Sequence, residues 1–294
     1  MTKRTIFLTG ATGRIGRILL KDLLKGDHRL IVLAYNGEEV DTSDPRVEYI
    51  FGNILEPSTY IPALKSADIV VHMAAITHTN EARKYYDINA GATADLVKYS
   101  KEFGIKRFIF ISTRAISEKG GHYSRSKIMA EKYVKEGGVG WVILRLAEVY
   151  GIGGEAGVNM VINNTEKLPF IPIIGDGRYR LAPVHISDVL YSIERVIRDE
   201  SVIDKTYNIA GPESFSYNDL VDKILKIKNL KKIQVHIPIW VVRILSYILS
   251  VLPGTKLFVI DQLPRFLCDK DDDISLAARE LDFKPVHITE RLGG

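Results

Sequence analysis

The chain contains little cysteine, little net charge and no long uninterrupted apolar run, and each shortage excludes a class of protein. A single cysteine among 294 residues, Cys268, rules out an internal disulfide and a cysteine zinc cluster, and it fits a reducing compartment. The formal net charge of +4 is too small to indicate a nucleic-acid partner. Because no secretory signal precedes the first apolar run, we expect a cytoplasmic protein.

The most apolar region, residues 237–260, is interrupted by Arg243, Lys256 and the Pro253-Gly254 pair. A membrane-spanning helix needs about 20 predominantly apolar residues, so we expect no transmembrane segment. Residues 240–252 favour a helix that covers the core or the substrate cleft. The alternative for this helix is contact with a membrane surface.

Apolar runs of strand length alternate with segments of helical period along the first half of the chain. The strand-like runs are residues 5–8, 30–34, 47–51, 69–73, 108–112 and 141–146, and the helical segments are residues 15–25, 85–103 and 126–135. Continuous apolar runs are typical of strands buried on both faces, and their alternation with helices indicates parallel crossovers. We therefore predict an α/β fold with a doubly wound parallel sheet of the Rossmann type.

Glycine and proline are frequent after residue 151, and this composition is typical of loops that build ligand clefts on a rigid scaffold. A strand and helix over residues 184–198 and a strand over 206–209 then return to the sheet pattern. We therefore expect two interleaved domains. The Rossmann dinucleotide-binding domain comprises residues 1–150 and about 184–211, and a smaller, mostly helical substrate-binding domain comprises residues 151–183 and 212–294.

The first strand leads into a glycine turn, Thr9-Gly10-Ala11-Thr12-Gly13-Arg14-Ile15-Gly16, that is followed by a helix. Gly10 allows a tight turn, Gly13 lets the backbone approach phosphates, and Gly16 lets the helix pack against the strand. The amides and the dipole at the start of the helix then face an anion. This order of elements predicts a dinucleotide site.

Tyr123 and Lys127 stand four residues apart at the head of a predicted helix, so both side chains project from one face. A tyrosine accepts a proton near neutral pH only if its pKa falls from about 10, and a nearby ammonium lowers a pKa by about 1 to 3 units. Thr113 ends the strand over 108–112, where open parallel sheets bind ligands. These three residues are the candidate catalytic groups. Taken alone, the Tyr123 and Lys127 pair fits a solvated helix face better than a catalytic pair.

Several further motifs occur in order along the chain: Val70-Val71-His72-Met73-Ala74-Ala75, Asn89 with Thr93, Lys106 to Thr113, Ala130-Glu131, Leu144-Arg145, Val149-Tyr150-Gly151, Gly175-Asp176-Gly177, Val184 to Val189 and Tyr207-Asn208-Ile209. With the glycine turn and the Tyr123 and Lys127 pair, they make the chain resemble the extended short-chain dehydrogenase/reductases, specifically the nucleotide-sugar epimerase and dehydratase group. The resemblance covers nearly the whole chain.

The resemblance implies roles for these residues. Tyr123 is the general acid/base, Lys127 holds the nicotinamide ribose and lowers the phenol pKa, and Thr113 positions the substrate hydroxyl. Ala74 and Ala75 pass beside the cofactor, and Asn89 organises the site. The cofactor-binding residues implied in this way are Gly10, Thr12, Gly13, Arg14, Ile15, Gly16, Asn36, Asn53, Ile54, Ala74, Ala75, Asn89, Tyr123 and Lys127. Asn159 and Arg180 are the implied contacts for a substrate diphosphate, and no metal site is expected.

Two departures from the family pattern bear on the cofactor and on the reaction. Leu33-Ala34-Tyr35-Asn36 stands where NAD-dependent members carry an acidic residue, so we favour NADP slightly over NAD, with Arg14 or Arg17 near the 2′-phosphate. Arg114-Ala115 follows Thr113 in place of the Asp-Glu pair of sugar 4,6-dehydratases, which disfavours dehydration.

The function predicted from these residues is an NAD(P)-dependent oxidoreductase and epimerase that acts on a carbinol of a nucleotide-sugar-like substrate. Two alternatives stay open: an NAD(P)H-dependent reductase or dehydrogenase of an apolar alcohol, and a non-catalytic cofactor sensor or assembly subunit. The resemblance also implies a homodimer formed through the helices over residues 81–103 and 124–135.

Overall fold

The computed structural model describes residues 3–35, 40, 43–153, 157–250, 262–268 and 270–293. These residues form two compact units that interleave along the chain. The first unit comprises Met1–Thr113, Arg125–Arg145 and Leu190–Tyr207, and the second comprises Arg114–Ser124, Leu146–Val189 and Asn208–Gly294. These ranges follow contacts and differ from the two expected domains, whose boundaries stay a prediction.

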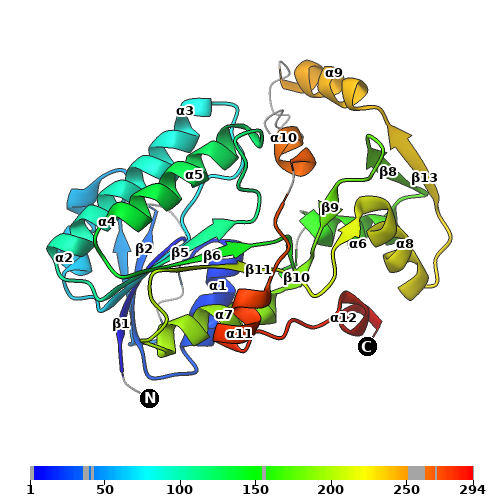
Figure 1. Ribbon diagram of the computed structural model, residues 1–294. Coiled ribbons are helices and arrows are strands. Elements are labelled where there is room, and N and C mark those ends of the chain that lie inside the picture. Colours follow the sequence, from blue (N-terminus) through cyan, green and yellow to red (C-terminus); the bar gives the residue numbers. More distant parts are fainter. Residues whose placement is uncertain are drawn as a thin grey trace. The chain divides into compact units, whose positions relative to one another are not determined.

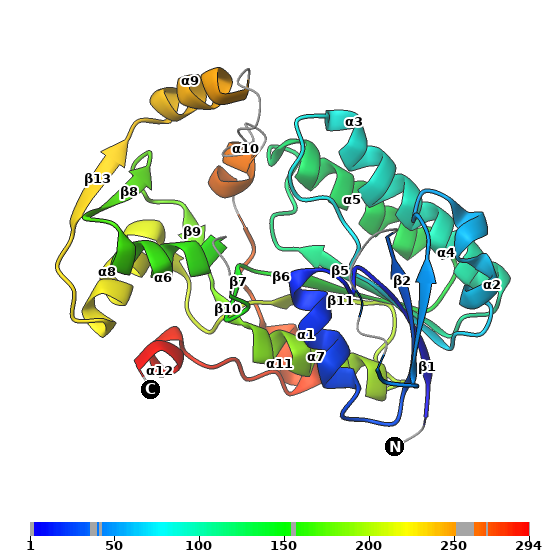
Figure 2. The same ribbon diagram turned by 180° about the vertical axis from the view of Figure 1, so that it is seen from behind.

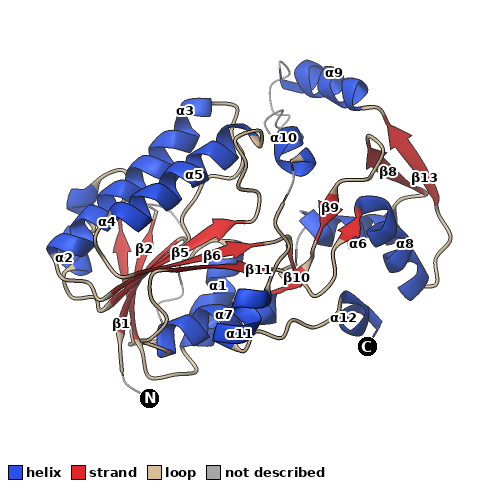
Figure 3. Ribbon diagram, in the orientation of Figure 1, coloured by secondary structure: helices blue, strands red, loops and turns tan. Residues whose placement is uncertain are grey.

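The first unit is built on a seven-stranded sheet, drawn in red in Figure 3. Its strands are β1 (Thr5–Thr9), β2 (Arg29–Ala34), β3 (Val47–Phe51), β4 (Ile69–His72), β5 (Arg107–Thr113), β6 (Trp141–Leu146) and β11 (Lys205–Ile209). They follow the order β3-β2-β1-β4-β5-β6-β11. Because the order reverses at β1, which pairs in parallel with both β2 and β4, the sheet is doubly wound. The predicted Rossmann-type α/β fold is confirmed.

The central strands of this sheet are buried on both faces, as their continuous apolar runs predict. Ile6, Phe7 and Leu8 of β1 have no exposed surface. Phe7 belongs to a core cluster with Phe108 of β5, which extends to side chains of the covering helices. Dense packing on both faces of the sheet fixes where its strand ends lie, and those ends carry the candidate site.

Helices cover both faces of the sheet (Figures 1 and 2). One face carries α1 (Arg14–Leu23) and most of α7 (Ile186–Arg198), and the other carries α2 (Ile61–Leu64), α4 (Ala92–Glu102) and α5 (Gly121–Glu136). Short helical segments lie at η1 (Pro57–Thr59) and α3 (Ala82–Lys84). The single helix predicted over 85–103 starts as a π-helix, η2 (Tyr85–Gly91), and continues as α4.

The described part of the second unit has its own apolar core and three two-stranded sheets. Its strands are β7 (Val149–Tyr150), β8 (Phe170–Ile174), β9 (Arg180–Leu181), β10 (Val184–His185), β12 (Phe215–Ser216) and β13 (Ile233–Ile237). Its helices are α6 (Gly157–Lys167), α8 (Tyr217–Ile227), α9 (Ile239–Ser250), α10 (Gln262–Leu267), α11 (Ser275–Leu281) and α12 (Ile288–Gly293). The helix predicted over 240–252 corresponds to α9, whereas β12 and β13 lie in a region that the sequence predicts to be mostly helical.

Candidate active site

The glycine turn leaves no room for side chains at two of its three glycines. Gly10 has a φ of +73°, and a Cβ there would lie 2.6 Å from the main-chain nitrogen of Ala74. A Cβ on Gly16 would lie 2.1 Å from the carbonyl oxygen of Gly10. Gly13 is exposed and is the N-cap of α1, and no side chain caps the helix. The Gly13 amide donates to the Gly10 carbonyl oxygen at 3.1 Å, and no side chain competes for the amides that follow it at the start of α1, which fits an anion such as a pyrophosphate.

The other turn residues surround this helix start. Thr12 and Ile15 are half-buried and Arg14 is exposed, while the Arg17 guanidinium donates to the carbonyl oxygen of Thr12 at 2.7 Å. A hollow of about 350 Å³ lies beside the turn, and Thr12, Arg17 and Lys21 are among its lining residues. Its rim therefore carries two cations close to the glycine turn.

A buried chain of hydrogen bonds runs under the glycine turn through His72. The Ala74 amide donates to Thr9 Oγ1 at 3.2 Å, Thr9 Oγ1 and His72 Nδ1 are 2.6 Å apart, and His72 Nε2 lies 2.8 Å from Thr93 Oγ1. Since Thr93 donates its hydroxyl proton to the carbonyl oxygen of Asn89 at 2.8 Å, it accepts from Nε2–H. In a neutral imidazole Nδ1 then accepts the proton of the Thr9 hydroxyl.

The environment of His72 agrees with a neutral ring. Burial lowers the pKa of His72 to about 3, and the Lys127 charge acts in the same direction. The ring also stacks on Phe110, with 5.4 Å between centroids. The imidazole consequently serves as a fixed hydrogen-bonding link between β1, β4 and the helix that carries Asn89.

Asn89 lies in the π-helical turn and is 1% exposed. Its side-chain oxygen accepts from the Ile76 amide at 2.8 Å, and its side-chain nitrogen donates to the Ile76 carbonyl oxygen at 3.0 Å and to Ser126 Oγ at 3.1 Å. It therefore joins the loop after β4 to helix α5. A π-helical turn often marks a functional site, and here it presents this asparagine.

Lys127 is buried on α5 directly after Ser126 and is 2% exposed. Its ammonium group donates to the Ile111 carbonyl oxygen at 2.9 Å and lies 3.9 Å from the centre of the Phe110 ring. Burial lowers the pKa of Lys127 to about 7, against the opposing effect of the Glu131 carboxylate. Lys127 therefore places a buried amine beside the end of β5.

Glu131, one helical turn after Lys127, is held by two neighbouring strands. Ser112 Oγ of β5 donates to it at 2.7 Å, and the Arg145 guanidinium of β6 donates at 2.9 Å and 2.6 Å. The bidentate pair fixes the rotation of α5 against the sheet. That rotation is what directs Lys127 toward Ile111.

Tyr123 precedes Lys127 by four residues on α5 and is 8% exposed. The Arg265 guanidinium lies 4.8 Å from the centre of the tyrosine ring. The next residue, Ser124, donates to the Ala115 carbonyl oxygen at 2.6 Å. Helical spacing thus places the phenol on the same face of α5 as the Lys127 side chain. Thr113 is the last residue of β5 and is half-buried.

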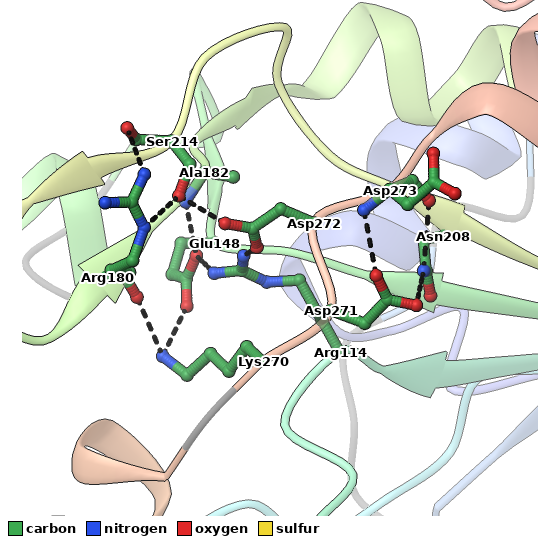
Figure 4. A network of polar contacts seen from close by, with 10 residues as sticks. All are labelled: Arg114, Glu148, Arg180, Ala182, Asn208, Ser214, Lys270, Asp271, Asp272 and Asp273. Carbon is green, nitrogen blue, oxygen red and sulfur yellow. Dashed lines mark hydrogen bonds and ion pairs between the residues drawn. The ribbon is translucent and has the colours of Figure 1, made fainter.

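Arg114, which follows Thr113, enters a buried network of charges in the second unit (Figure 4). Its side chain is 1% exposed and pairs with Glu148 at 2.7 Å and with Asp272. Lys270, 3% exposed, pairs with Glu148 at 3.0 Å. Burial tends to raise the pKa of Glu148, but the charges of Lys270 and Arg114 outweigh it and lower that pKa. Arg114, which stands where the resemblance to sugar 4,6-dehydratases implies an acidic residue, is therefore a buried and paired cation.

The remaining expected site residues have local partners. Asn159 Oδ1 accepts from the Gly151 amide at 3.1 Å, and the Arg180 guanidinium donates to the Ser214 hydroxyl and carbonyl oxygens at 3.1 Å and 2.9 Å. Asn53 accepts from the Leu55 amide at 3.0 Å, and its neighbour Ile54 packs against the core of the first unit. Asn36 lies outside the described residues. The roles of these residues stay predictions.

Sequence reasoning missed four positioning residues that the structure brings to the site: Thr9, His72, Ser126 and Glu131. His72 and Glu131 lie inside motifs on which the family resemblance depends. Their place in those motifs is the sequence feature that could have identified them as positioning residues. Nothing in the sequence indicates that Thr9 and Thr93 bond the same imidazole.

Residues 6–210 match the family described as NAD dependent epimerase/dehydratase family. The chain belongs to this family. It is 26% identical over 312 residues to UDP-glucose 4-epimerase of Vibrio cholerae, a match that covers 96% of this chain and 91% of that one. It is also 27% identical over 229 residues to NADH dehydrogenase (ubiquinone) 1 alpha subcomplex subunit 9 of Dictyostelium discoideum, covering 75% of this chain and 62% of the relative. The chain spans about three fifths of that relative and of a Sinorhizobium fredii protein.

Among solved structures, the fold is similar to dTDP-glucose 4,6-dehydratase from Streptomyces venezuelae with NAD and TYD bound. The TM-score is 0.78 at 19% identity, and the match covers 98% of this chain and 94% of that chain. Membership of an NAD-dependent enzyme family, as expected from the sequence, is confirmed. Within the described residues, no helix is long and apolar enough to cross a membrane.

Proposed function

We propose that this member of the family is an NAD(P)-dependent epimerase that oxidises and re-reduces one carbinol carbon of a nucleotide sugar. The observation that carries the proposal is the buried Lys127 ammonium at the end of β5, on the helix that presents Tyr123 four residues earlier. Such a pair suits proton transfer to and from an alcohol. The similarity to UDP-glucose 4-epimerase of Vibrio cholerae supports the substrate class.

The residues divide the chemistry between them. When bound, the oxidised nicotinamide supplies the acceptor for the hydride that leaves the carbinol carbon. Tyr123 takes the hydroxyl proton at its phenol oxygen, and Thr113 hydrogen-bonds the substrate oxygen. Lys127 holds positive charge near the phenol, while Asn89 and Ser126 fix the helix that carries both residues. Tyr123 would return the proton to the substrate oxygen when the same carbon is re-reduced from its opposite face, and the carbon would then be inverted.

Two finer features belong to the same proposal. The glycine turn binds the pyrophosphate, and Arg14, or Arg17 beside its hollow, is the candidate cation for a 2′-phosphate if the cofactor is NADP. The similar dehydratase structure from Streptomyces venezuelae contains NAD, which supports NAD as the alternative dinucleotide. Asn159 and Arg180 are proposed contacts of the substrate diphosphate, and a homodimer stays a prediction.

A non-catalytic assembly subunit is the second candidate function. The similarity to a subunit of NADH dehydrogenase in Dictyostelium discoideum favours it. In that case the chain would bind a dinucleotide without turning over a substrate. Retention of both Tyr123 and Lys127 supports the catalytic alternative instead.

The test is to incubate the purified protein with NAD or NADP and a panel of UDP- and dTDP-hexoses, and to follow the sugars by NMR. An epimerase interconverts two sugars without net release of reduced cofactor. Stoichiometric release would indicate a dehydrogenase or reductase, including one that acts on an apolar alcohol. Tight binding of the dinucleotide with no product from any substrate would favour the assembly subunit.

A further inference from the structure

Helix α9 exposes apolar side chains where a helix on a protein surface normally carries polar ones. Trp240, Ile244 and Leu245 are 65%, 51% and 50% exposed, whereas Val242 is 8% exposed. Trp240 and Ile244 are four residues apart and so share one face of the helix. We call Trp240, Ile244 and Leu245 the apolar face of α9. A face of this kind indicates an interaction surface.

The sheet that precedes α9 continues this apolar character. Strands β8 and β13 pair in parallel with Phe170 opposite Ile233, and these two side chains are 44% and 74% exposed. Val235, two residues further along β13, is 40% exposed, while Ile171 and Ile173 of β8 are buried. One face of the sheet thus packs on the core and the other is apolar and exposed. Figure 1 shows β13 running directly into α9.

The chain segment that carries this surface is cationic, and the nearest acidic side chain that contacts it is Asp222 of α8, which accepts a hydrogen bond from Gln234 of β13. Between Asp222 and Asp261 the chain contains no acidic residue, and it contains the cations Lys223, Lys226, Lys228, Lys231, Lys232, Arg243 and Lys256. Lys223, Lys228 and Lys232 have partners elsewhere in the second unit, at Glu213, Glu166 and the Leu168 carbonyl oxygen. Lys231 and Arg243 are exposed beside Ile233 and on α9. An apolar surface flanked by such cations matches an anionic lipid surface.

We propose that α9 and the outer face of β8 and β13 bind peripherally to an anionic membrane surface. The apolar face of α9 enters the boundary between headgroups and acyl chains, where a tryptophan ring is favoured. Lys231 and Arg243 contact the lipid phosphates. The proposal does not depend on the proposed epimerase activity.

A second copy of the chain is a poorer occupant of this surface. A two-fold dimer places the same patch on both sides of its interface, so the cations of one copy would face those of the other. An anionic lipid surface instead supplies negative charge for the cations and also accepts the apolar side chains. The charge pattern therefore favours lipid over self-association.

The two tryptophans of the chain, Trp141 and Trp240, allow a direct test. The substitution Trp141→Phe leaves Trp240 as the only tryptophan. This variant is titrated with vesicles of phosphatidylcholine alone or mixed with phosphatidylglycerol. We expect a blue shift of the Trp240 emission, protection from acrylamide and quenching by brominated acyl chains. The anionic vesicles should bind about tenfold more tightly or better, and added salt should reduce this difference.

Matched variants separate this surface from general hydrophobic adsorption. Ile244→Glu should abolish vesicle binding, while Ile203→Glu, at a residue 41% exposed in the first unit, should leave it unchanged. If Ile244→Glu lowers the melting temperature, Arg243→Glu tests the same surface by removing the preference for anionic vesicles.

Three results would overturn the proposal. Trp240 emission could stay unchanged at saturating vesicle concentrations. The Ile203→Glu variant could lose binding as much as Ile244→Glu does. Trp240 could already be shielded from acrylamide before lipid is added. Shielding that does not depend on protein concentration would mean that the protein itself covers the surface. Shielding that increases with protein concentration would mean that a second copy covers it.

Discussion

The Lys127 ammonium group lies 2.9 Å from the main-chain carbonyl oxygen of Ile111 and 3.9 Å from the centre of the Phe110 ring. A carbonyl dipole and an aromatic face stabilise a cation, but only in part, and the side chain is 2% exposed. Burial therefore dominates and lowers the pKa of Lys127 to about 7. Lys127, which we propose acts on Tyr123, is thus balanced between two protonation states near neutral pH.

This balance makes the stability of the protein depend on pH. Lys127 has a pKa of 10.5 when exposed, so between about pH 7 and 10.5 the unfolded chain holds a proton that the folded chain has lost. The free energy of unfolding should therefore rise with pH in this window, by at most about 1.4 kcal/mol per pH unit. Urea titrations of the ligand-free protein at several pH values measure this dependence of the free energy of unfolding on pH. Lys127→Met should remove that part of the slope, and equal slopes in both proteins would contradict the burial argument.

Substitution of Gly16 should damage the glycine turn by a clash with the main chain. The Cβ of alanine would lie 2.1 Å from the Gly10 carbonyl oxygen and 2.5 Å from Ala11 Cα. We expect Gly16→Ala to lower the free energy of unfolding by about 1 to 3 kcal/mol and to weaken dinucleotide binding. Calorimetric titration with NAD measures the binding. Gly26→Ala, whose Cβ would have nearest neighbours at 3.5 Å, is the matched control and should bind as the wild type does.

Removal of the Glu131 charge should lower both the free energy of unfolding and the pKa of Lys127. Glu131→Gln keeps the size of the side chain but weakens the paired bonds from Arg145, at a cost of about 1 to 3 kcal/mol. Because the Glu131 carboxylate raises the pKa of Lys127, we expect that pKa to fall further in the variant. NMR of protein labelled with carbon-13 at the lysine ε position reports it. Glu136→Gln, at an exposed position on the same helix, should leave the Lys127 resonance unchanged.

The buried charges around Arg114 should make the second unit sensitive to the loss of a single carboxylate. Glu148→Gln leaves Arg114 and Lys270 with less compensating charge, so we expect a loss of about 3 kcal/mol in the free energy of unfolding. The more exposed pair of Glu213 and Lys223 provides the control, since Glu213→Gln should cost about 1 kcal/mol or less. Thermal unfolding of both variants makes the comparison, and equal losses would argue against a structural role for Arg114.

The sequence could predict the parts of this fold that depend on local pattern. The apolar runs and the three turn glycines are contiguous in the chain, and each is interpretable from its own residues. Tyr123 and Lys127 could be placed on one face because helical spacing alone decides it.

The rest depends on contacts between distant segments. Thr9, His72 and Thr93 meet only because β1 and β4 are neighbours and α4 starts beside them. The pairing of Arg114 with Asp272 likewise joins segments that share no local signal. The parallel pairing of β8 with β13 was missed for the same reason, since neither strand is followed by the regular crossover that predicts the central sheet.

The proposed epimerisation depends on proton transfer between Tyr123 and a bound alcohol. The most direct measurement compares the wild type with Tyr123→Phe, using dinucleotide binding by calorimetry and interconversion of the active hexose by NMR. We predict unchanged binding of the dinucleotide within about twofold and a loss of turnover of about 10² to 10⁴. Turnover in Tyr123→Phe equal to that of the wild type would contradict the proposed chemistry.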